Sequence, residues 1–363
     1  MSSMHTDLPH FRVLDARVSN QYEEWLRLFA ASPGREPHSH PAFSLVLSPA
    51  DNDPLCAVSQ NGEGGFFMPF WRRRIPEYGH LRAAPLYDSI TPYGYGGAYR
   101  WGRESDPSSF WTGFEAWSRE SMLVEHVTRC SLFADEPSAP PGEIIKSFAN
   151  VSVLLQDGSE SAWSRVEPRL RQQARRAVRE GVVVKRIHEA FGLQAFRDLY
   201  VETMNRHGAE DFFYFSLKQL DQLARALGKG WHLYLASVGT VPVAGEIVLL
   251  GTRRAYLFLA GSSELGRRTR ANALLRKVIF GSLFTSGTHE YVLGGGMGSD
   301  DSLLRSKAAF APGRTLAFRV KTWTIHPTVE RLLVEARRAS EANWNPSPGF
   351  APRYRAPGIE APE

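Results

Sequence analysis

The sequence predicts an α+β fold made of two similar units packed around a central cleft. The first reason is length, because 363 residues exceed one typical domain. The second is the order of elements. Each half reads as helices, an antiparallel strand meander, a further helix and further strands, without evident sequence repetition between the halves. We therefore expect two units of the same architecture.

The first half begins with a strand over residues 11–16. A helix follows, since Tyr22, Trp25, Leu26 and Phe29 recur at the spacing of one helical face. The stretch 32–54 is rich in Pro, Ser, Asn and Asp and predicts a loop. The remaining elements are strands at 55–60 and 65–71 around the hairpin turn 61–64, a strand at 86–90, a loop at 91–97, a helix at 110–123 and a strand at 125–132.

The second half contains a meander whose central strand, 241–250, is dense in Val, Ile and Leu, as expected of a central strand. Before it we expect a strand at 150–155, an arginine-rich helix, a strand at 182–187 and a helix at 191–204. After it we expect an apolar helix at 271–284, a strand at 290–293, a glycine turn at 294–298, a short helix at 301–309 and a strand at 316–320.

The predicted domain boundaries follow from the Pro/Ser-rich stretch 137–143. Domain 1 spans residues 1–142 and is rejoined by a C-terminal helix over 326–340, whereas domain 2 spans 143–325. Residues 345–363 contain five prolines and no periodic pattern. We expect them to form a flexible tail.

The composition indicates a soluble globular protein, with 43% apolar, 12% aromatic and 22% charged residues. No window approaches the roughly 20 apolar residues of a membrane span. The start of the chain lacks the basic and apolar regions of a secretory signal. Only Cys56 and Cys130 are present, too few for a disulfide scaffold. A cytoplasmic location is the simplest expectation.

The positive charge is concentrated in one segment. Residues 165–186 contain eight basic and two acidic side chains, a net charge of +6, whereas the whole chain carries +5. Apolar residues three or four apart, such as Val166, Leu170 and Ala174, form one helical stripe there, and arginines cover the other faces. Guanidinium groups grip phosphates bidentately. The segment is therefore either a solvated face or a surface for polyphosphate or RNA.

Four motifs together resemble the Fem-like branch of the GNAT acyltransferase superfamily, which includes Fem peptidyltransferases and BioF2-like acyltransferases. They are TPYGYGGA at 91–98, LRQQARRAVREGV at 170–182, FYFS at 213–216 and LGGGMGSDDSLLRSKAAF at 293–310. The resemblance implies two GNAT-like units with the substrates meeting between them. It also implies acyl transfer to an amine, with aminoacyl-tRNA as donor in the Fem enzymes.

The resemblance places Lys307 first among catalytic candidates, because an ammonium group can orient the acceptor or steady charge on the carbonyl or leaving oxygen. Asp300 and Asp301 precede its helix. We expect one of them to cap that helix and the other to bind the incoming amine or accept a proton from it. Arg305 is either a phosphate contact or a structural pair.

The other substrate-binding candidates are less specific. Gly295 and Gly296 either offer amides to an anion or permit a close approach of the chain. The resemblance suggests cleft-facing or substrate-facing side chains for Tyr93 and Tyr95, and for Tyr214 and Ser216. Packing in the core is the alternative for these residues, as it is for Tyr256.

The identity of the acyl donor is suggested by the arginines at 267–270, which stand where a glycine-rich turn is expected. GNAT enzymes that bind coenzyme A hold its diphosphate on the backbone amides of a glycine-rich turn at a helix start. At that place this chain has Arg267, Arg268 and Arg270 and no glycine. Side-chain contacts to phosphate are thereby favoured. The predicted phosphate or tRNA contacts are these three arginines together with Arg171, Arg175, Arg176 and Arg179.

Three functions remain open at this point. The leading prediction is transfer of an aminoacyl group from aminoacyl-tRNA to an amine of a peptidoglycan precursor or a small metabolite, with no cofactor. The second is acyl-CoA-dependent N-acyl transfer, with acetyl-CoA or another acyl-CoA as donor. The third is a non-catalytic protein that binds RNA or another polyanion. No metal is expected, because the His38 and His40 side chains should point to opposite sides of an extended segment, and no carboxylate lies at a position that suggests a metal triad.

Overall fold

The computed structural model describes residues 10–78, 85–103, 106–133, 138–187, 190–296, 302–341 and 343–358. The chain forms two compact units, Met1–Ser147 with Phe318–Glu363 (unit 1) and Phe148–Ala317 (unit 2). The boundaries between these units fall inside strands β7 (Glu143–Leu154) and β13 (Thr315–Thr324). Each of these strands therefore begins in one unit and ends in the other.

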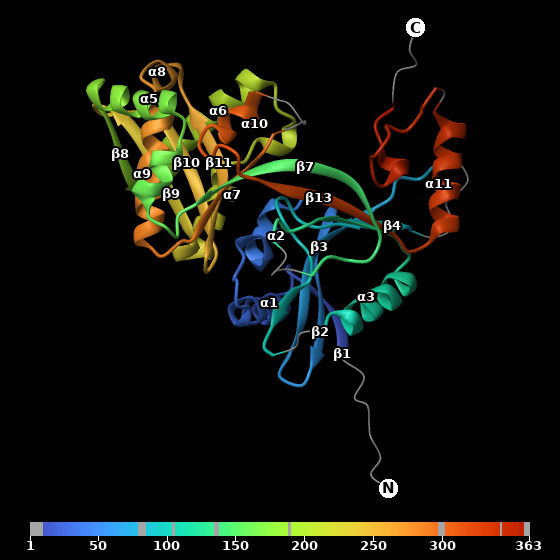
Figure 1. Ribbon diagram of the computed structural model, residues 1–363. Helices are drawn as coiled ribbons and strands as arrows, with labels where there is room; N and C mark the ends of the chain where they lie inside the picture. The colour runs from blue at the N-terminus through green and yellow to red at the C-terminus, as the bar shows by residue number, and fades with distance from the viewer. Residues whose placement is uncertain are drawn as a thin grey trace. The chain divides into compact units, whose positions relative to one another are not determined.

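Unit 1 holds a mixed sheet in the order β1-β2-β3-β4-β6-β13, with β5 paired to β3. Its β4 and β6 are parallel. The elements are β1 (His10–Asp15), α1 (Ser19–Ala31), α2 (Pro41–Leu47), β2 (Asn52–Asn61), β3 (Gly64–Arg74), β4 (Tyr87–Ile90), β5 (Tyr99–Trp101), α3 (Ser108–Glu120), β6 (Leu123–Arg129) and α11 (Pro327–Ser340) (Figure 1).

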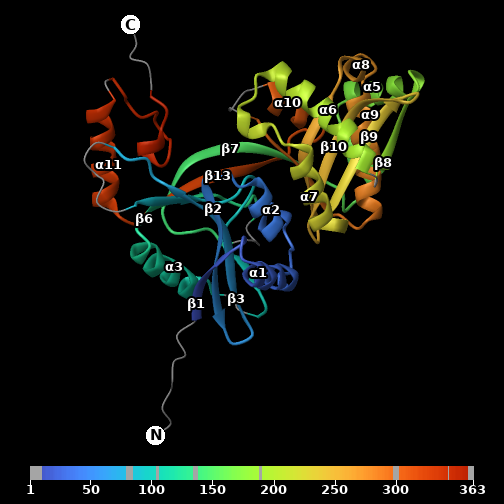
Figure 2. The same ribbon diagram turned by 180° about the vertical axis from the view of Figure 1, so that it is seen from behind.

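Unit 2 holds strands in the order β7-β12-β11-β10-β9-β8, and its β11 and β12 are parallel. The elements are α4 (Ser159–Arg165), α5 (Pro168–Arg179), β8 (Val182–Ile187), α6 (Ala190–His207), α7 (Leu217–Leu227), β9 (Trp231–Val238), β10 (Val241–Leu250), β11 (Arg254–Ser262), α8 (Glu264–Arg268), α9 (Ala271–Thr285), β12 (Glu290–Gly295) and α10 (Ser302–Ala308) (Figure 2).

The two units repeat one succession of elements. In unit 1 it is β1, α1, α2, β2, β3, β4, α3 and β6, and in unit 2 it is β8, α6, α7, β9, β10, β11, α8 with α9, and β12. In both, three antiparallel strands are followed by a helical crossover to a strand that runs parallel to the third. The predicted α+β fold with two similar units is confirmed.

Unit 2 buries its sheet between two helical layers. On one face, the small residues Ala174 and Ala177 of α5 join the core that α9 supplies with Ile279 and Phe280. On the other face α6 packs closely on the sheet. A Cβ added to Gly261 of β11 would lie 2.6 Å from the Tyr200 amide nitrogen of α6, so only glycine allows this approach. Burial of each large apolar side chain contributes about 1.5–3 kcal/mol.

Two local predictions were wrong. Residues 41–47, expected as loop, form the helix α2, which begins at Pro41 with the His40 Nδ1 accepting from the Ala42 amide. Its residues are buried almost all round, so no amphipathic pattern marks it in the sequence. The arginine-rich segment is not one helix. It ends α4, forms α5 and enters β8, because Pro168 disfavours helical backbone in the residue before it.

The predicted flexible tail is also wrong for residues 345–358. The Tyr354 side chain is fully buried, and its carbonyl accepts hydrogen bonds from the Tyr78 hydroxyl (3.0 Å) and from Arg337 (2.8 Å). Arg353 pairs with Glu330 of α11 at 2.7 Å. Local pattern missed this segment because these contacts join residues far apart in the chain.

One ion pair fastens this segment to the sheet of unit 1. The Asp88 carboxylate of β4 is fully buried and pairs with Arg73 at 2.6 Å and with Arg355. Removing Arg355 leaves that carboxylate with one cation in place of two. Loss of a hydrogen bond to a buried charge costs about 2 kcal/mol.

We therefore predict that Arg355→Met lowers the thermal unfolding midpoint measured by circular dichroism. Arg338→Met is the matched control, since Arg338 is exposed on α11, and we expect its midpoint to equal that of the wild type. Equal midpoints for Arg355→Met and the wild type would show that the C-terminal segment does not stabilise unit 1.

Candidate functional site

The sheet of unit 2 opens between β11 and β12. The two strands pair only from Arg254–Glu290 to Tyr256–Val292. Beyond that point β11 continues to Ser262 along β10, and β12 continues to Gly295 along β7. Two parallel strands thus part toward their carboxyl ends, the edge at which ligands bind in sheets of this kind.

The parting is built into both strands. The pairing of β11 with β10 shifts between Ile247 and Val248, so that Phe258 is an extra residue on β11. The pairing of β12 with β7 shifts in the same way and makes Leu293 an extra residue. A bulge increases local twist and bends its strand. One bulge in each strand directs the two carboxyl ends apart.

The equivalent position in unit 1 is filled by the chain itself. After β4, the Thr91 amide donates to the Val127 carbonyl of β6 at 3.0 Å, and the Gly96 amide donates to the Arg129 carbonyl at 2.7 Å. The Arg129 guanidinium donates to the Thr91 carbonyl at 2.7 Å. The loop of residues 91–97 thereby continues the ladder alongside β6. Over the described residues, the open parallel pair is in unit 2.

This loop contains the predicted Tyr93 and Tyr95. The Tyr95 ring lies edge-on to His38 at 5.2 Å and to Phe318 at 5.5 Å. Burial raises the pKa of both tyrosine hydroxyls. Gly94 between them has φ +99°, and a Cβ there would lie 2.3 Å from the His38 ring. Both tyrosines are thus held in a packed loop of unit 1.

Lys307 stands at the carboxyl end of β12. It lies on α10, is half-buried, and its Nζ donates to the Gly295 carbonyl at 2.6 Å. A Cβ at Gly295 would meet the Ala149 carbonyl oxygen at 2.7 Å, so glycine lets β12 approach β7 closely. The structure therefore brings Lys307 and Gly295 together, beside Gly296. Arg305 is exposed on the same helix, and Asp300 and Asp301 lie outside the described residues.

Two arginines stand at the carboxyl end of β11. Arg206 of α6 donates to the Ser262 carbonyl at 3.3 Å. Burial, with a smaller contribution from the nearby Arg267 charge, lowers the pKa of Arg206. One terminal nitrogen of Arg267 is buried without a hydrogen-bond partner in the described part of the chain. An anion bound here would relieve the repulsion between these like charges.

Three backbone amides at this corner are already hydrogen-bonded. The amides of Arg267, Thr269 and Arg270 donate to the carbonyls of Ser263, Leu265 and Arg267, at 3.1, 2.9 and 3.2 Å. The short helix α8 is fixed by the Ser263 cap, and Gly266 packs on β10, where a Cβ would meet the Val243 carbonyl oxygen at 2.1 Å. These amides do not form an open cradle for a diphosphate. Phosphate contact there falls to the side chains of Arg267, Arg268 and Arg270.

The remaining substrate candidates are placed in different ways. Tyr256 forms the last pair before β11 and β12 part, and its side chain is buried. Ser216 caps α7, accepting from the Gln219 amide at 3.2 Å. The Tyr214 hydroxyl donates to Asn205 of α6 at 3.0 Å. Their neighbour Phe215 packs against Phe258, the bulge residue of β11, with ring centroids 5.8 Å apart. The segment 214–216 therefore supports β11 beyond its pairing with β12.

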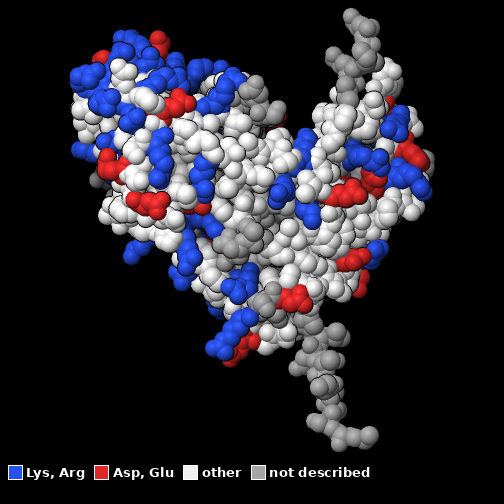
Figure 3. All heavy atoms as spheres, in the orientation of Figure 1, with Lys and Arg blue, Asp and Glu red and all other residues white. Residues whose placement is uncertain are grey.

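The predicted arginines of α5 lie on its solvent side. Arg175, Arg176 and Arg179 are exposed, and Arg171 is half-buried. Arg176 pairs with Glu180 at 3.3 Å. Figure 3 shows Lys and Arg gathered over the end of unit 2 where α5 and α8 lie. No group of three His, Cys, Asp or Glu side chains suited to a metal, and no helix able to span a membrane, occurs among the described residues.

Sequence reasoning missed Arg206 and the parting itself. No local signal marks either of them, because the first depends on α6 lying against β11. The second depends on how two strands are registered against different neighbours. The glycine-free stretch at 267–272 was the one local indication of this corner.

Comparison with known proteins gives one family match, over part of the chain. The family Acetyltransf_6, described as an acetyltransferase (GNAT) domain, matches residues 164–301, which contain β11, β12 and α8. No curated protein sequence matches the chain.

Solved structures are similar over most of the chain. The crystal structure of FemX has a TM-score of 0.65 at 11% identity, covering 86% of this chain and 98% of that one. The C-terminal domain (DUF2156) of a putative lysylphosphatidylglycerol synthetase from Agrobacterium fabrum has a TM-score of 0.54 at 13% identity, covering 87% and 97%. A conserved protein of unknown function from Bacteroides thetaiotaomicron scores 0.54 at 10% identity, covering 85% and 98%. These similarities confirm, at the level of fold, the resemblance to the Fem-like branch.

The close approach at Gly295 gives a test of this geometry. We predict that Gly295→Ala lowers the thermal unfolding midpoint, because the added methyl group collides with the backbone of β7. Gly281→Ala in α9 is the control. A Cβ there meets nothing within 4 Å, and alanine in a helix is more stable than glycine by roughly 0.5–1 kcal/mol. A midpoint for Gly295→Ala at or above the wild-type value would contradict the geometry.

Proposed function

We propose that this chain is an N-acyltransferase that moves an aminoacyl group from aminoacyl-tRNA to an amine of a peptidoglycan precursor or a small metabolite. The observation that carries the proposal is the parting of β11 and β12. One strand end bears the Lys307 ammonium, and the other bears Arg206 and the incompletely paired Arg267. In this proposal the reacting carboxyl group lies at the parted strand ends, and its phosphate-bearing carrier lies on the arginines.

The chemistry needs no protein nucleophile. The neutral amine attacks the ester carbonyl, a tetrahedral oxyanion forms, the bond to the 3′-oxygen breaks and the amide remains. The proton lost by the attacking nitrogen is taken up by the leaving oxygen. In this proposal Lys307 stabilises the developing negative charge, and its half-buried position supports the role because a fixed ammonium there acts more strongly than one in water. Alignment of the two substrates supplies the remaining rate enhancement.

The choice of donor rests on the α8 corner. A coenzyme A diphosphate held by a glycine-rich turn requires amides that are free to donate. Here the amides of Arg267, Thr269 and Arg270 already donate within the chain, while arginine side chains surround the end of β11. Guanidinium groups suit the phosphodiesters of RNA. The FemX similarity is consistent with this choice.

A second candidate is acyl-CoA-dependent N-acyl transfer. It is favoured by the family that matches residues 164–301, whose description is an acetyltransferase domain. The same strands and the same Lys307 would serve it, and only the carrier of the acyl group differs. A third candidate, polyanion binding without catalysis, would use the arginines alone.

The experiment that separates these candidates measures transfer to a panel of amines, with labelled aminoacyl-tRNAs or acetyl-CoA as donor, with and without ribonuclease. We expect amide formation from aminoacyl-tRNA that ribonuclease abolishes. Transfer from acetyl-CoA that ribonuclease leaves unchanged would replace the first proposal by the second. RNA binding without any product would support the third.

We further predict that Lys307→Met lowers kcat about 100-fold or more and leaves KM for the donor and the thermal midpoint close to wild type. The substitution removes the ammonium group and retains the length of the side chain. Lys218→Met is the control, because Lys218 is exposed on α7, and its kinetics should be unchanged. Full activity of Lys307→Met in steady-state assays would remove Lys307 from the mechanism.

A further inference from the structure

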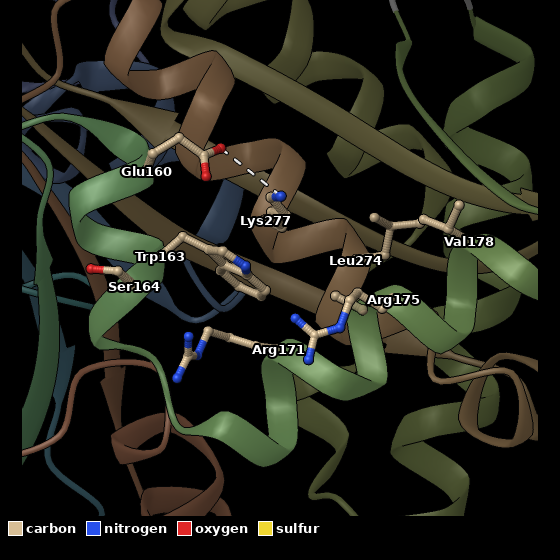
Figure 4. A pocket seen from close by; sticks show the side chains of 9 residues that line it. Glu160, Trp163, Ser164, Arg171, Arg175, Val178, Leu274 and Lys277 are labelled. Carbon is tan, nitrogen blue, oxygen red and sulfur yellow. Dashed lines mark ion pairs between the residues drawn. The ribbon is translucent and has the colours of Figure 1, made fainter.

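Unit 2 has a pocket whose lining contains no residue of β11 or β12. It is an open pocket of about 350 Å³ between α4, α5 and α9 (Figure 4). Its apolar wall consists of Trp163, Ala174, Val178 and Leu274. Its polar lining consists of Glu160, Ser164, Arg171, Arg175 and Lys277.

Three cations face this pocket. Arg171 and Arg175 stand one turn apart on α5, with Arg175 ending below Trp163 and Arg171 extending toward the α4 side, whereas Lys277 of α9 lies above Trp163 beside Glu160 in this view (Figure 4). The Arg171 Nε donates to the Val166 carbonyl at 3.1 Å, which holds the guanidinium in place. Arg175 is exposed and has no ion pair within the described ranges. Two guanidinium groups on one side of α5 thus line the pocket without a shared counter-charge.

The single carboxylate at the pocket belongs to Glu160. It lies 3.9 Å from the Lys277 Nζ, at the limit of an ion pair, and its side chain is 82% exposed. An exposed pair of this length contributes little. Lys277 also lies 5.9 Å from the Trp163 ring centroid, within the range of a cation–π contact. The pocket therefore keeps an excess of positive charge that Glu160 does not neutralise.

The pocket continues a row of cations. In both ribbon views α5 and α8 lie at the same end of unit 2 (Figures 1 and 2). Lys277 is six residues beyond the start of α9 at Ala271, about 9 Å along the helix axis. Val178 of α5 and Leu274 of α9 both line the pocket, so the end of α5 that carries Arg179 lies toward the start of α9, which follows α8. Residues one turn apart are about 5 Å apart along an axis, a spacing suited to a polymer with a charge on every unit.

We propose that the pocket between α4, α5 and α9 is a phosphate subsite for an RNA backbone, in which Arg171 and Arg175 bind the phosphodiester groups and Lys277 adds positive charge. This inference rests on the proposed function, because the RNA is the carrier of the acyl group. The subsite lies beyond the arginines at the end of β11, so it holds the carrier at a second point. The contact is to phosphate and is independent of base sequence.

A single phosphate group could also come from a free mononucleotide, and the test distinguishes the two sources. Binding of the full-length protein to a fluorescent, deacylated RNA hairpin of acceptor-stem length is measured by anisotropy over a range of salt concentrations. Binding of AMP is measured by calorimetry. The variants are Arg171→Ala and Arg175→Ala, with Arg253→Ala as control, since Arg253 is exposed in the turn before β11, at the opposite end of that strand from α8.

We expect each pocket variant to weaken RNA binding several-fold and to reduce the slope of log K against log salt by about 0.7–0.9, the loss of one phosphate contact. Arg253→Ala should match the wild type, and AMP should bind with no measurable heat. Wild-type affinity and slope in both pocket variants would overturn the subsite. So would AMP binding that Arg175→Ala abolishes while RNA binding stays intact.

The donor assay separates failure of this inference from failure of the proposed function. If the wild-type protein transfers from aminoacyl-tRNA, and the Arg171 and Arg175 variants bind RNA as the wild type does, the subsite alone is overturned. RNA binding that depends on Arg175, without transfer from aminoacyl-tRNA, overturns the proposed donor and supports the subsite.

Discussion

The site depends on one interruption of backbone pairing, at Tyr256 and Val292, where β11 and β12 cease to share a ladder. Each strand keeps its hydrogen bonds on its other side, to β10 and to β7, so the interruption affects only the two facing edges. Backbone groups inside a protein must find partners. In the proposed mechanism the substrate lies along these facing edges.

The two units show how the same topology can be closed or open. In unit 1 the residues after β4 turn back along β6, and Arg129 reaches across to the Thr91 carbonyl. In unit 2 Ser263 caps a helix directly after β11, which carries the chain away from β12. A few residues after the third strand of the meander thus decide which unit keeps an opening. The family match to residues 164–301 falls on the open one.

Positive side chains stand at both strand ends of that opening. The end of β12 carries the Lys307 ammonium on a backbone carbonyl, and the end of β11 carries Arg206 beside Arg267. Holding like charges together costs free energy in the absence of an anion, and the cost falls when an anion is bound. The cations of α5 extend this field over the surface of unit 2 (Figure 3). A carrier with many phosphates is the ligand that such a distribution favours.

The sequence alone determined the class of fold and most of the helices and strands, and it marked the arginine-rich and Lys307 segments as candidates for the site. Periodicity, caps and charge clusters are local properties, so they can be read along the chain. Tertiary structure decided the rest: the packing of Tyr354 and Arg355 on unit 1, the arrival of Arg206 at β11, the bulges at Phe258 and Leu293, and the pocket beside Trp163. Each of these joins residues that are distant in sequence, and strand register and helix packing, which bring such residues together, leave no local pattern.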